Sequence, residues 1–310
     1  MSQKKATREA YGEALAEFGG KYDLVVLDAD LSKSTKTDTF RQKYPDRFIN
    51  CGIAEANMMS IAAGIATTGK TVFASSFAMF AAGRAYEQVR NSIAYPELNV
   101  KIGATHAGIS VGEDGATHQP IEDISLMRAI PGMVVISPAD GYEARGAVEA
   151  AILHKGPVYL RFGRLAVPYV NEPDYKFELG KGVTLKDGSD ITIISTGLMV
   201  KEALDASDIL KNEGISARVI NIHTIKPIDK EIIIKAARET GAVITAEEHN
   251  IIGGLGSAVA EVLVENFPVK MIRVGINDKF GKSGKPLALL EEYGLTASNI
   301  VSNAKKLLNK

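Results

Sequence analysis

The sequence predicts an α/β protein with two domains, each built on a mostly parallel sheet flanked by helices. The chain has 310 residues, about twice the size of a common domain. Short β-branched runs alternate along it with longer segments of helical period, as in parallel α/β sheets. A stretch around residues 167–181 interrupts this alternation with two prolines and mixed charge. We therefore expect domains at residues 1–170 and 186–310, joined by a linker at residues 171–185.

The first predicted domain begins with a helix and continues with short apolar runs, which are typical of buried parallel strands. The expected strands are Leu24–Leu27, Thr71–Phe73, Val100–Ala104, Val134–Ile136 and Val158–Leu160. The expected helices are Thr7–Phe18, Ala54–Thr67, Gly83–Ser92 and Tyr142–Leu153. We expect every crossover between parallel strands to be right-handed.

The second predicted domain repeats the same alternation over a shorter length. Its expected strands are Ile191–Ile194, Ala217–Ile220, Val243–Ala246 and Met271–Val274. Its expected helices are Val200–Lys211, Asp229–Glu239 and Gly256–Glu265.

Composition argues against several classes of protein. Lys and Arg number 36 against 37 Asp and Glu, so the charge expected of a general nucleic-acid binder is missing. No apolar run reaches the roughly 20 residues that span a bilayer, and the start of the chain lacks the apolar stretch of a signal peptide. Cys51 is the one cysteine, which excludes an internal disulfide and a multi-thiolate metal site. We expect a soluble, cytoplasmic protein.

Polar side chains gather after the predicted strands of the first domain, where open parallel sheets bind ligands. They are Asp28, Asp30, Ser32, Ser34, Glu55, Ser75, Ser76, His106, Glu113, Asp114, His118, Arg161 and Arg164. The densest segment is the loop Thr105–Asp123. Its glycines and aspartates could serve only as turn formers, but two imidazoles beside carboxylates favour a functional site. A zinc site is the weaker interpretation, because the histidine spacing matches no recognised zinc pattern.

Three strings carry a resemblance to a known family. They are GIAEANM (Gly52–Met58), SSFAMF (Ser75–Phe80) and GEDGATHQP (Gly112–Pro120). The chain resembles transketolase from about Lys5 onward, and more narrowly its C-terminal half, a pyrimidine-binding domain followed by a small C-terminal domain. The third string is the specific one. The first is shared with the β subunits of 2-oxoacid dehydrogenases and with deoxyxylulose-phosphate synthase.

The resemblance implies thiamine diphosphate as cofactor, with carbanion chemistry supplied by the cofactor and orientation by the protein. The cofactor-binding residues that it implies are Glu55, Phe77, Phe80 and Asp30. Glu55 matches the glutamate that hydrogen-bonds the aminopyrimidine N1′ and is implied to be catalytic. Phe77 and Phe80 match aromatic residues that pack on the pyrimidine ring. Without the resemblance, Glu55 would be interpreted as a helix cap and the two phenylalanines as core residues.

Three features stay open at this stage. Gly83 stands where many family members carry a tyrosine, and Tyr86 could replace that contact. Cys51 is interpreted as a small buried residue and not as a nucleophile. The segment Glu247–His249 precedes a GGLG string, which the family suggests packs a helix start against a neighbouring subunit.

The resemblance also implies a sugar-phosphate site. Its substrate-binding residues are Arg8, Ser34, His106, Asp114, His118 and Arg164. Two guanidinium groups, an imidazole and a hydroxyl suit a dianionic phosphate. His106 and His118 are implied to be catalytic as well, because they move protons at the substrate. Taken singly, each arginine would be interpreted as a surface residue.

The metal-binding half of the family's site is not visible in this sequence. Family members hold the diphosphate and Mg²⁺ through a GDG motif and a downstream Asn. Asp114-Gly115 and Asp187-Gly188 both lack the preceding Gly. We therefore expect no metal ligands in this chain, and a partner subunit that carries GDG and Asn and holds the Mg²⁺. By analogy with the family, the expected assembly is an α2β2 heterotetramer.

The predicted function is transfer of a two-carbon ketol unit from a ketose phosphate to an aldose phosphate, with this chain as one subunit of a split enzyme. A first alternative is the β subunit of a 2-oxoacid dehydrogenase, which gives no reason for the phosphate-binding positions. A second is a non-catalytic paralogue retained for assembly. Glu55, His106, Asp114 and His118 argue against that second alternative.

Overall fold

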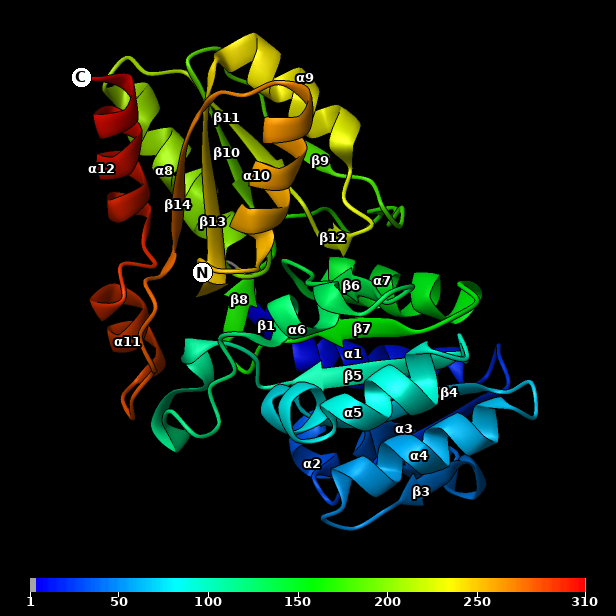
Figure 1. Ribbon diagram of the computed structural model, residues 1–310. Coiled ribbons are helices and arrows are strands. Elements are labelled where there is room, and N and C mark those ends of the chain that lie inside the picture. Colours follow the sequence, from blue (N-terminus) through cyan, green and yellow to red (C-terminus); the bar gives the residue numbers. More distant parts are fainter. Residues whose placement is uncertain (1–3, 310) are drawn as a thin grey trace.

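A seven-stranded sheet organises the lower half of the molecule as drawn in Figure 1. The computed structural model describes residues 4–309. The strands of this sheet are β2 (Leu24–Asp28), β3 (Phe48–Asn50), β4 (Thr71–Phe77), β5 (Val100–Thr105), β6 (Val134–Ile136), β7 (Val158–Arg161) and β12 (Thr224–Lys226). Their order is β12-β6-β7-β5-β4-β2-β3, and all neighbours are parallel except β12 and β6.

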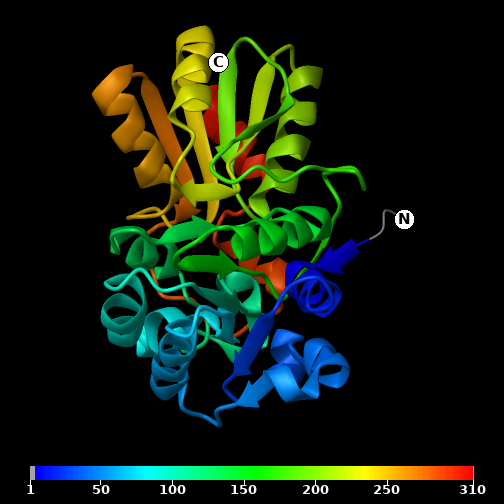
Figure 2. The same cartoon turned by 90° about the vertical axis from the view of Figure 1, so that its right-hand side faces the viewer.

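Helices cover both faces of this sheet. They are α1 (Thr7–Phe18), α2 (Ser32–Thr35), α3 (Asp38–Lys43), α4 (Glu55–Ala66), α5 (Tyr86–Gln88), α6 (Asp123–Ala129) and α7 (Gly141–Leu153). One apolar core lies between the sheet and α4, α5 and α6, and another lies between the sheet and α1, α3 and α7. Figure 2 shows this layered half stacked below the second one.

The second half repeats the layering around a five-stranded sheet of order β14-β13-β10-β11-β9. Its strands are β9 (Val183–Lys186), β10 (Ile191–Ser195), β11 (Ala217–Asn221), β13 (Ala242–Asn250) and β14 (Lys270–Ile276). Its helices are α8 (Met199–Asn212), α9 (Lys230–Thr240), α10 (Leu255–Asn266), α11 (Pro286–Glu292) and α12 (Ala297–Leu308). Helices α8, α11 and α12 cover one face, and α9 and α10 the other. Among residues 4–309, no helix has the length and apolarity to cross a membrane.

The predicted fold class is confirmed: two mixed, mostly parallel sheets flanked by helices. Helix α1 has the predicted bounds, and α4 differs from its prediction only by the two capping residues. The predicted helix Gly83–Ser92 is wrong in type. Two π-helical turns, Met79–Arg84 and Val89–Ala94, flank the short α5 there. A π turn accommodates an additional residue within a helix, and such turns are frequent at functional sites.

Two short pairings tie the ends of the first half together and connect it to the second half. Strand β1 (Lys4–Ala6) pairs antiparallel with β8 (Ala166–Pro168). Strand β12 lies in the second half of the sequence, yet it forms the outer strand of the first sheet, where Thr224 pairs with Ile136. Strand β9 begins inside the range expected to be a linker.

Candidate active site

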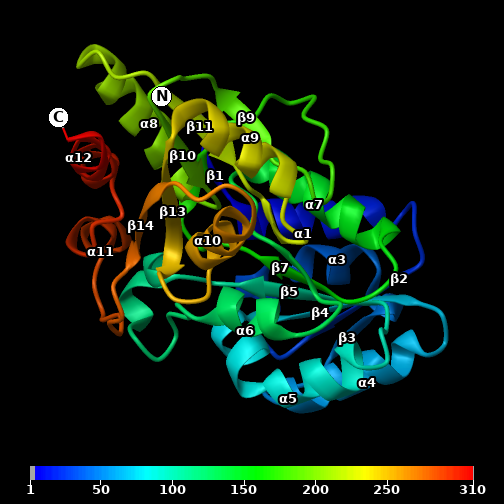
Figure 3. The same cartoon turned by 45° about the horizontal axis from the view of Figure 1, so that its top comes forward.

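The parallel strands of the first sheet end side by side and so bring their loops together. Asp28 at the end of β2 pairs with Ser75 of β4, and Phe77 at the end of β4 pairs with Thr105 of β5. Strand β4 runs four residues beyond the predicted Phe73, so Ser75 and Ser76 are buried strand residues and not loop residues. Figure 3 shows β13 of the second half directed toward the same region.

Arg8 of α1 contacts two other residues of the expected phosphate site. Its Nη1 donates a hydrogen bond to the backbone oxygen of Ser34 at 2.7 Å and lies 3.3 Å from Nε2 of His106. Burial is the main cause that lowers the pKa of Arg8. A half-buried cation beside an imidazole forms a local positive site, which an anion would neutralise.

Arg164 lies on a segment that is bonded directly to the start of α1. The backbone N–H of Gly163 donates to Thr7 Oγ1 at 2.9 Å. The Arg164 guanidinium donates to the backbone oxygen of Val111 and, at 3.2 Å, to the Glu113 carboxylate. The Thr7–Gly163 hydrogen bond therefore connects the residues that precede Arg8 and Arg164 in the sequence.

His106 follows β5 in a strained backbone conformation, with φ of 56°. Its ring stacks on Phe77 with centroids 3.8 Å apart, and its Nδ1 lies 2.9 Å from Thr105 Oγ1. Burial, followed by the charges of Arg8 and Arg164, lowers the pKa of His106 to about 3. The imidazole is therefore neutral near pH 7, and strain of this kind clusters at functional sites.

Two phenylalanine rings form an aromatic surface beside His106. Phe77 and Phe80 have centroids 5.9 Å apart and planes inclined by 14°. His118 meets the ring of Phe80 edge-on at 5.3 Å. Both histidines of the loop predicted to be functional thus contact this surface.

The carboxylate of Glu55 lies at the far side of the aromatic surface. Glu55 is the first residue of α4 and is 2% exposed. Its Oε2 accepts a hydrogen bond at 2.9 Å from Arg84 Nη1, and the Arg84 guanidinium lies 4.3 Å from the centroid of Phe80. A continuous series of contacts therefore runs from Ser34 through Arg8, His106 and the two phenylalanines to Arg84 and Glu55.

Arg84 is a site residue that the sequence did not single out. It ends the first π turn and contacts both Glu55 and Phe80. Tyr86 packs against the apolar core of the sheet. Cys51 packs there too, but it is half-buried and not buried as expected. The one available signal was a basic residue just after the SSFAMF string.

Two further predicted residues, Asp30 and Asp114, lie on the loops that follow β2 and β5. Asp30 has φ of 63° and exchanges hydrogen bonds with the side chain of Asn50, at 3.1 and 3.0 Å. Asp114 is exposed at the end of a 3₁₀ turn, Ile109–Asp114.

Asp28 was recognised as polar but not as a site residue. Its carboxylate accepts hydrogen bonds from Leu31 N–H at 2.6 Å and from the hydroxyls of Thr35 and Thr37 at 2.7 and 2.9 Å. Burial raises the pKa of Asp28. Asp28 therefore fixes the turn that carries Ser34.

The donor set fits one end of thiamine diphosphate better than a metal ion. A buried carboxylate suits the aminopyrimidine N1′, and two nearly parallel phenyl rings suit a flat heterocycle. Within residues 4–309, no group of three His, Cys, Asp or Glu side chains could hold a metal ion.

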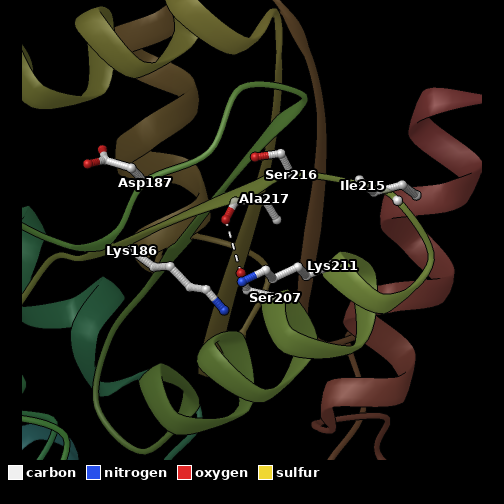
Figure 4. Close-up of a pocket in the computed structure, with 8 residues that line it drawn as sticks. Lys186, Asp187, Ser207, Lys211, Ile215, Ser216 and Ala217 are labelled. Carbon is white, nitrogen blue, oxygen red and sulfur yellow. Dashed lines mark hydrogen bonds between the residues drawn. The ribbon is translucent and has the colours of Figure 1, made fainter.

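A hollow of about 320 Å³ in the second half lies apart from these residues (Figure 4). Lys186, Ser207 and Lys211 line it. The Ser207 hydroxyl donates to the backbone oxygen of Ala217 at 3.0 Å, and Lys186 pairs with Asp208. Because Ser207 and Lys186 already have partners, we assign no second candidate site to this hollow.

The fold and the site define an α/β protein with a pyrimidine-binding domain followed by a smaller α/β domain. The family models for the transketolase pyrimidine-binding domain and the transketolase C-terminal domain match residues 3–170 and 180–300. The chain belongs to the transketolase family and corresponds to its C-terminal section.

Several known proteins are similar along the whole chain. A Methanocaldococcus jannaschii protein described as a transketolase C-terminal section is 56% identical over 99% of this chain and 97% of its own length. The 6-deoxy-6-sulfo-D-fructose transketolase subunit SqwH of Clostridium sp. is 45% identical over 98% of this chain and 94% of its own length. A solved structure described as split gene transketolase, inactive beta4 tetramer, superimposes with a TM-score of 0.91 at 55% identity, covering 99% of both chains. The chain spans half the length of rat transketolase, with 40% identity.

Proposed function

We propose that this chain is the subunit of a split transketolase that supplies the pyrimidine-binding and sugar-phosphate-binding sides of the active site. The observation that supports this most directly is the series of contacts from Ser34 and Arg8 through His106, Phe77 and Phe80 to Glu55. An anion-binding end and a ring-binding end are thereby joined in one site. A ketose phosphate beside a thiamine heterocycle needs both ends together.

Each residue has a role that its position supports. Arg8, Ser34, His106 and Arg164 bind the substrate's terminal anion, and Asp114 binds a donor hydroxyl. The neutral imidazole of His106 and the imidazole of His118 exchange protons with the substrate oxygens. Phe77 and Phe80 pack on the pyrimidine ring, Glu55 hydrogen-bonds its N1′, and Asp30 lies near the cofactor. When bound, thiamine diphosphate supplies the carbanion that makes and breaks the carbon–carbon bond.

The diphosphate and its Mg²⁺ are proposed to be held by a partner subunit that carries the GDG and Asn residues. The similar structure described as an inactive beta4 tetramer fits a chain that needs a second chain for activity. We propose an α2β2 heterotetramer in the cytoplasm. The alternative of a 2-oxoacid dehydrogenase β subunit leaves the cluster of Arg8, His106 and Arg164 without a substrate group to bind.

The test is to isolate the chain from its source at native mass, identify any bound protein, and assay the complex for ketol transfer. Donors with a terminal phosphate and with a terminal sulfonate are compared, because relatives are named for an apulose phosphate and for a sulfofructose. We expect a bound chain with GDG and Asn, and activity that is lost in Glu55→Ala. A homo-oligomer without that partner, or a fully active Glu55→Ala complex, would contradict the proposal.

A further inference from the structure

The loop that carries His106, Asp114 and His118 is held by a residue from the second half of the chain. Glu248 lies near the end of β13, in the sheet of the second half, and is 5% exposed. Its Oε1 accepts a hydrogen bond from the backbone N–H of Ser110 at 2.6 Å. Ser110 lies four residues after His106 and four before Asp114.

The loop is shaped to admit this carboxylate. At Gly108, with φ of 81°, a Cβ atom would lie 2.3 Å from the carboxyl carbon of Glu248. Only a residue without a side chain leaves that space, and only glycine adopts that backbone conformation readily. Two positions of the loop, Gly108 and Ser110, are therefore matched to one side chain from the other half.

The end of β13 is itself fixed against the first half. Arg161 of β7 donates to the backbone oxygen of Glu248 at 3.0 Å and forms two hydrogen bonds with the Asp123 carboxylate, at 2.8 and 3.2 Å. The N–H of Asn250 donates to the backbone oxygen of Ile121 at 2.7 Å. Glu248 thus reaches the loop from a rigid support, as a positioning contact requires.

The loop's other end has separate partners. The Gln119 amide nitrogen donates to the backbone oxygens of Ile109, Gly112 and Lys282, at 3.2, 3.1 and 3.0 Å. The N–H groups of Ala107 and Gly108 donate to the backbone oxygens of Phe162 and Pro120, at 3.2 and 3.1 Å. Loss of the Glu248 contact would therefore loosen the backbone at Ser110 without freeing the whole loop.

We propose that Glu248 is a positioning residue for ketol transfer, which fixes through Ser110 the loop that presents His106 and Asp114 to the substrate. The role rests on the proposed function, because it matters to catalysis only if this loop binds substrate. Glu248 accepts its hydrogen bond from the backbone N–H of Ser110, so it acts through the backbone.

The charged groups that face Glu248 are Arg161 of β7 and Asp123 of α6. Burial, opposed by the charge of Arg161, raises the pKa of Glu248 to about 7. A charge-assisted hydrogen bond is stronger than a neutral one. The contact with Ser110 should therefore weaken as the pH falls through about 7.

The first test measures hydrogen exchange at the Ser110 amide in the full chain. Glu248→Gln keeps the shape and removes the charge, so we expect exchange roughly tenfold faster than in the wild type. Glu202→Gln is the matched control, because the Glu202 carboxylate also accepts a backbone N–H, that of Ala297 at 2.7 Å, away from the loop. In the wild type, protection of Ser110 should fall as the pH drops below about 7, which tests the contact without any variant.

The second test measures kinetics in the complex with the partner subunit. We expect Glu248→Gln to raise KM for the ketose phosphate roughly three- to tenfold, with a smaller change in kcat, and Glu202→Gln to change neither. If the Ser110 amide of Glu248→Gln exchanges at the wild-type rate, the proposal is overturned. It is also overturned if exchange is faster but KM is unchanged. If the wild-type complex shows no ketol transfer, the proposed function fails instead, and Ser110 exchange alone decides whether Glu248 holds the loop.

Discussion

The guanidinium of Arg84 lies 2.9 Å from the carboxylate of Glu55, and the two side chains are 52% and 2% exposed. One partner is buried at the start of α4, where the helix dipole also favours an anion. The other reaches in from the solvent side, across the ring of Phe80. A bound pyrimidine ring that needs the Glu55 carboxylate must therefore share it with Arg84 or displace that side chain.

Replacing Arg84 should destabilise the free chain, because the buried Glu55 loses its counter-charge. For Arg84→Met we expect a loss of about 1–2 kcal/mol in the free energy of unfolding, less than for a fully buried pair because Arg84 is half exposed. Urea unfolding at pH 7 measures this. In a Glu55→Gln background the same change should cost much less. Equal costs in both backgrounds would show that the pair is not coupled.

His106 should stay neutral in the folded chain well below pH 6. Because its pKa is lowered to about 3, the folded state binds fewer protons than the unfolded state, and stability falls as the pH drops from about 6.5 toward 3. In Arg8→Met the pKa of His106 should rise, since a neighbouring positive charge is lost. NMR titration of the imidazoles measures both. His154 serves as internal control, because its lowered pKa is caused by burial and by Lys101.

Glu143 should give a stability change of the opposite sign. Burial raises its pKa from 4.5 to about 8, so the folded state holds a proton that the unfolded state has lost. The free energy of unfolding should therefore decrease as the pH rises from about 4.5 to about 8, by an amount on the order of a few kcal/mol. Glu143→Gln mimics the protonated form and should remove this decrease. Chemical denaturation across that pH range compares the two, and parallel curves would contradict the assignment.

The hydrogen bond from Gly163 to Thr7 should matter for substrate binding through its two arginine neighbours. Thr7→Val removes the acceptor, and one hydrogen bond of about 1 kcal/mol corresponds to a roughly fivefold higher KM for the ketose phosphate. Steady-state kinetics of the complex measures this. Thr67→Val is the control, because its hydroxyl caps a carbonyl at an exposed helix end. An unchanged KM in Thr7→Val would show that the Gly163–Thr7 hydrogen bond does not contribute to substrate binding by the two arginines.

Local patterns were sufficient for the elements whose signal lies within their own residues. Helix α1 and strand β6 have the predicted bounds. The helical period of α1 and the continuous apolar run of β6 are both visible in the sequence itself. His106 and Ser34 were also predicted as candidate site residues, because both follow parallel strands, and parallel strands end at one edge of the sheet. The resemblance then assigned them roles that the contacts of Arg8 support.

The features that the sequence missed depend on partners far along the chain. Strand β12 has three residues and pairs with a strand 88 residues earlier, from Thr224 to Ile136, so no local period reveals it. Arg84, which pairs with Glu55, ends a π turn, and such a turn shifts side chains by about one position from where an α-helix would place them. Glu248 reaches Ser110 across 138 residues. Each of these is decided by tertiary packing and not by residue propensity.

The placement of β12 limits where this chain could be cut. A fragment that ended near residue 175 would keep six strands of the first sheet and expose the whole outer side of β6. An unpaired strand edge is a template for another chain, so such fragments would pair with one another and precipitate. The boundary between the two domains is therefore a poor site for a break, by a protease or in a gene.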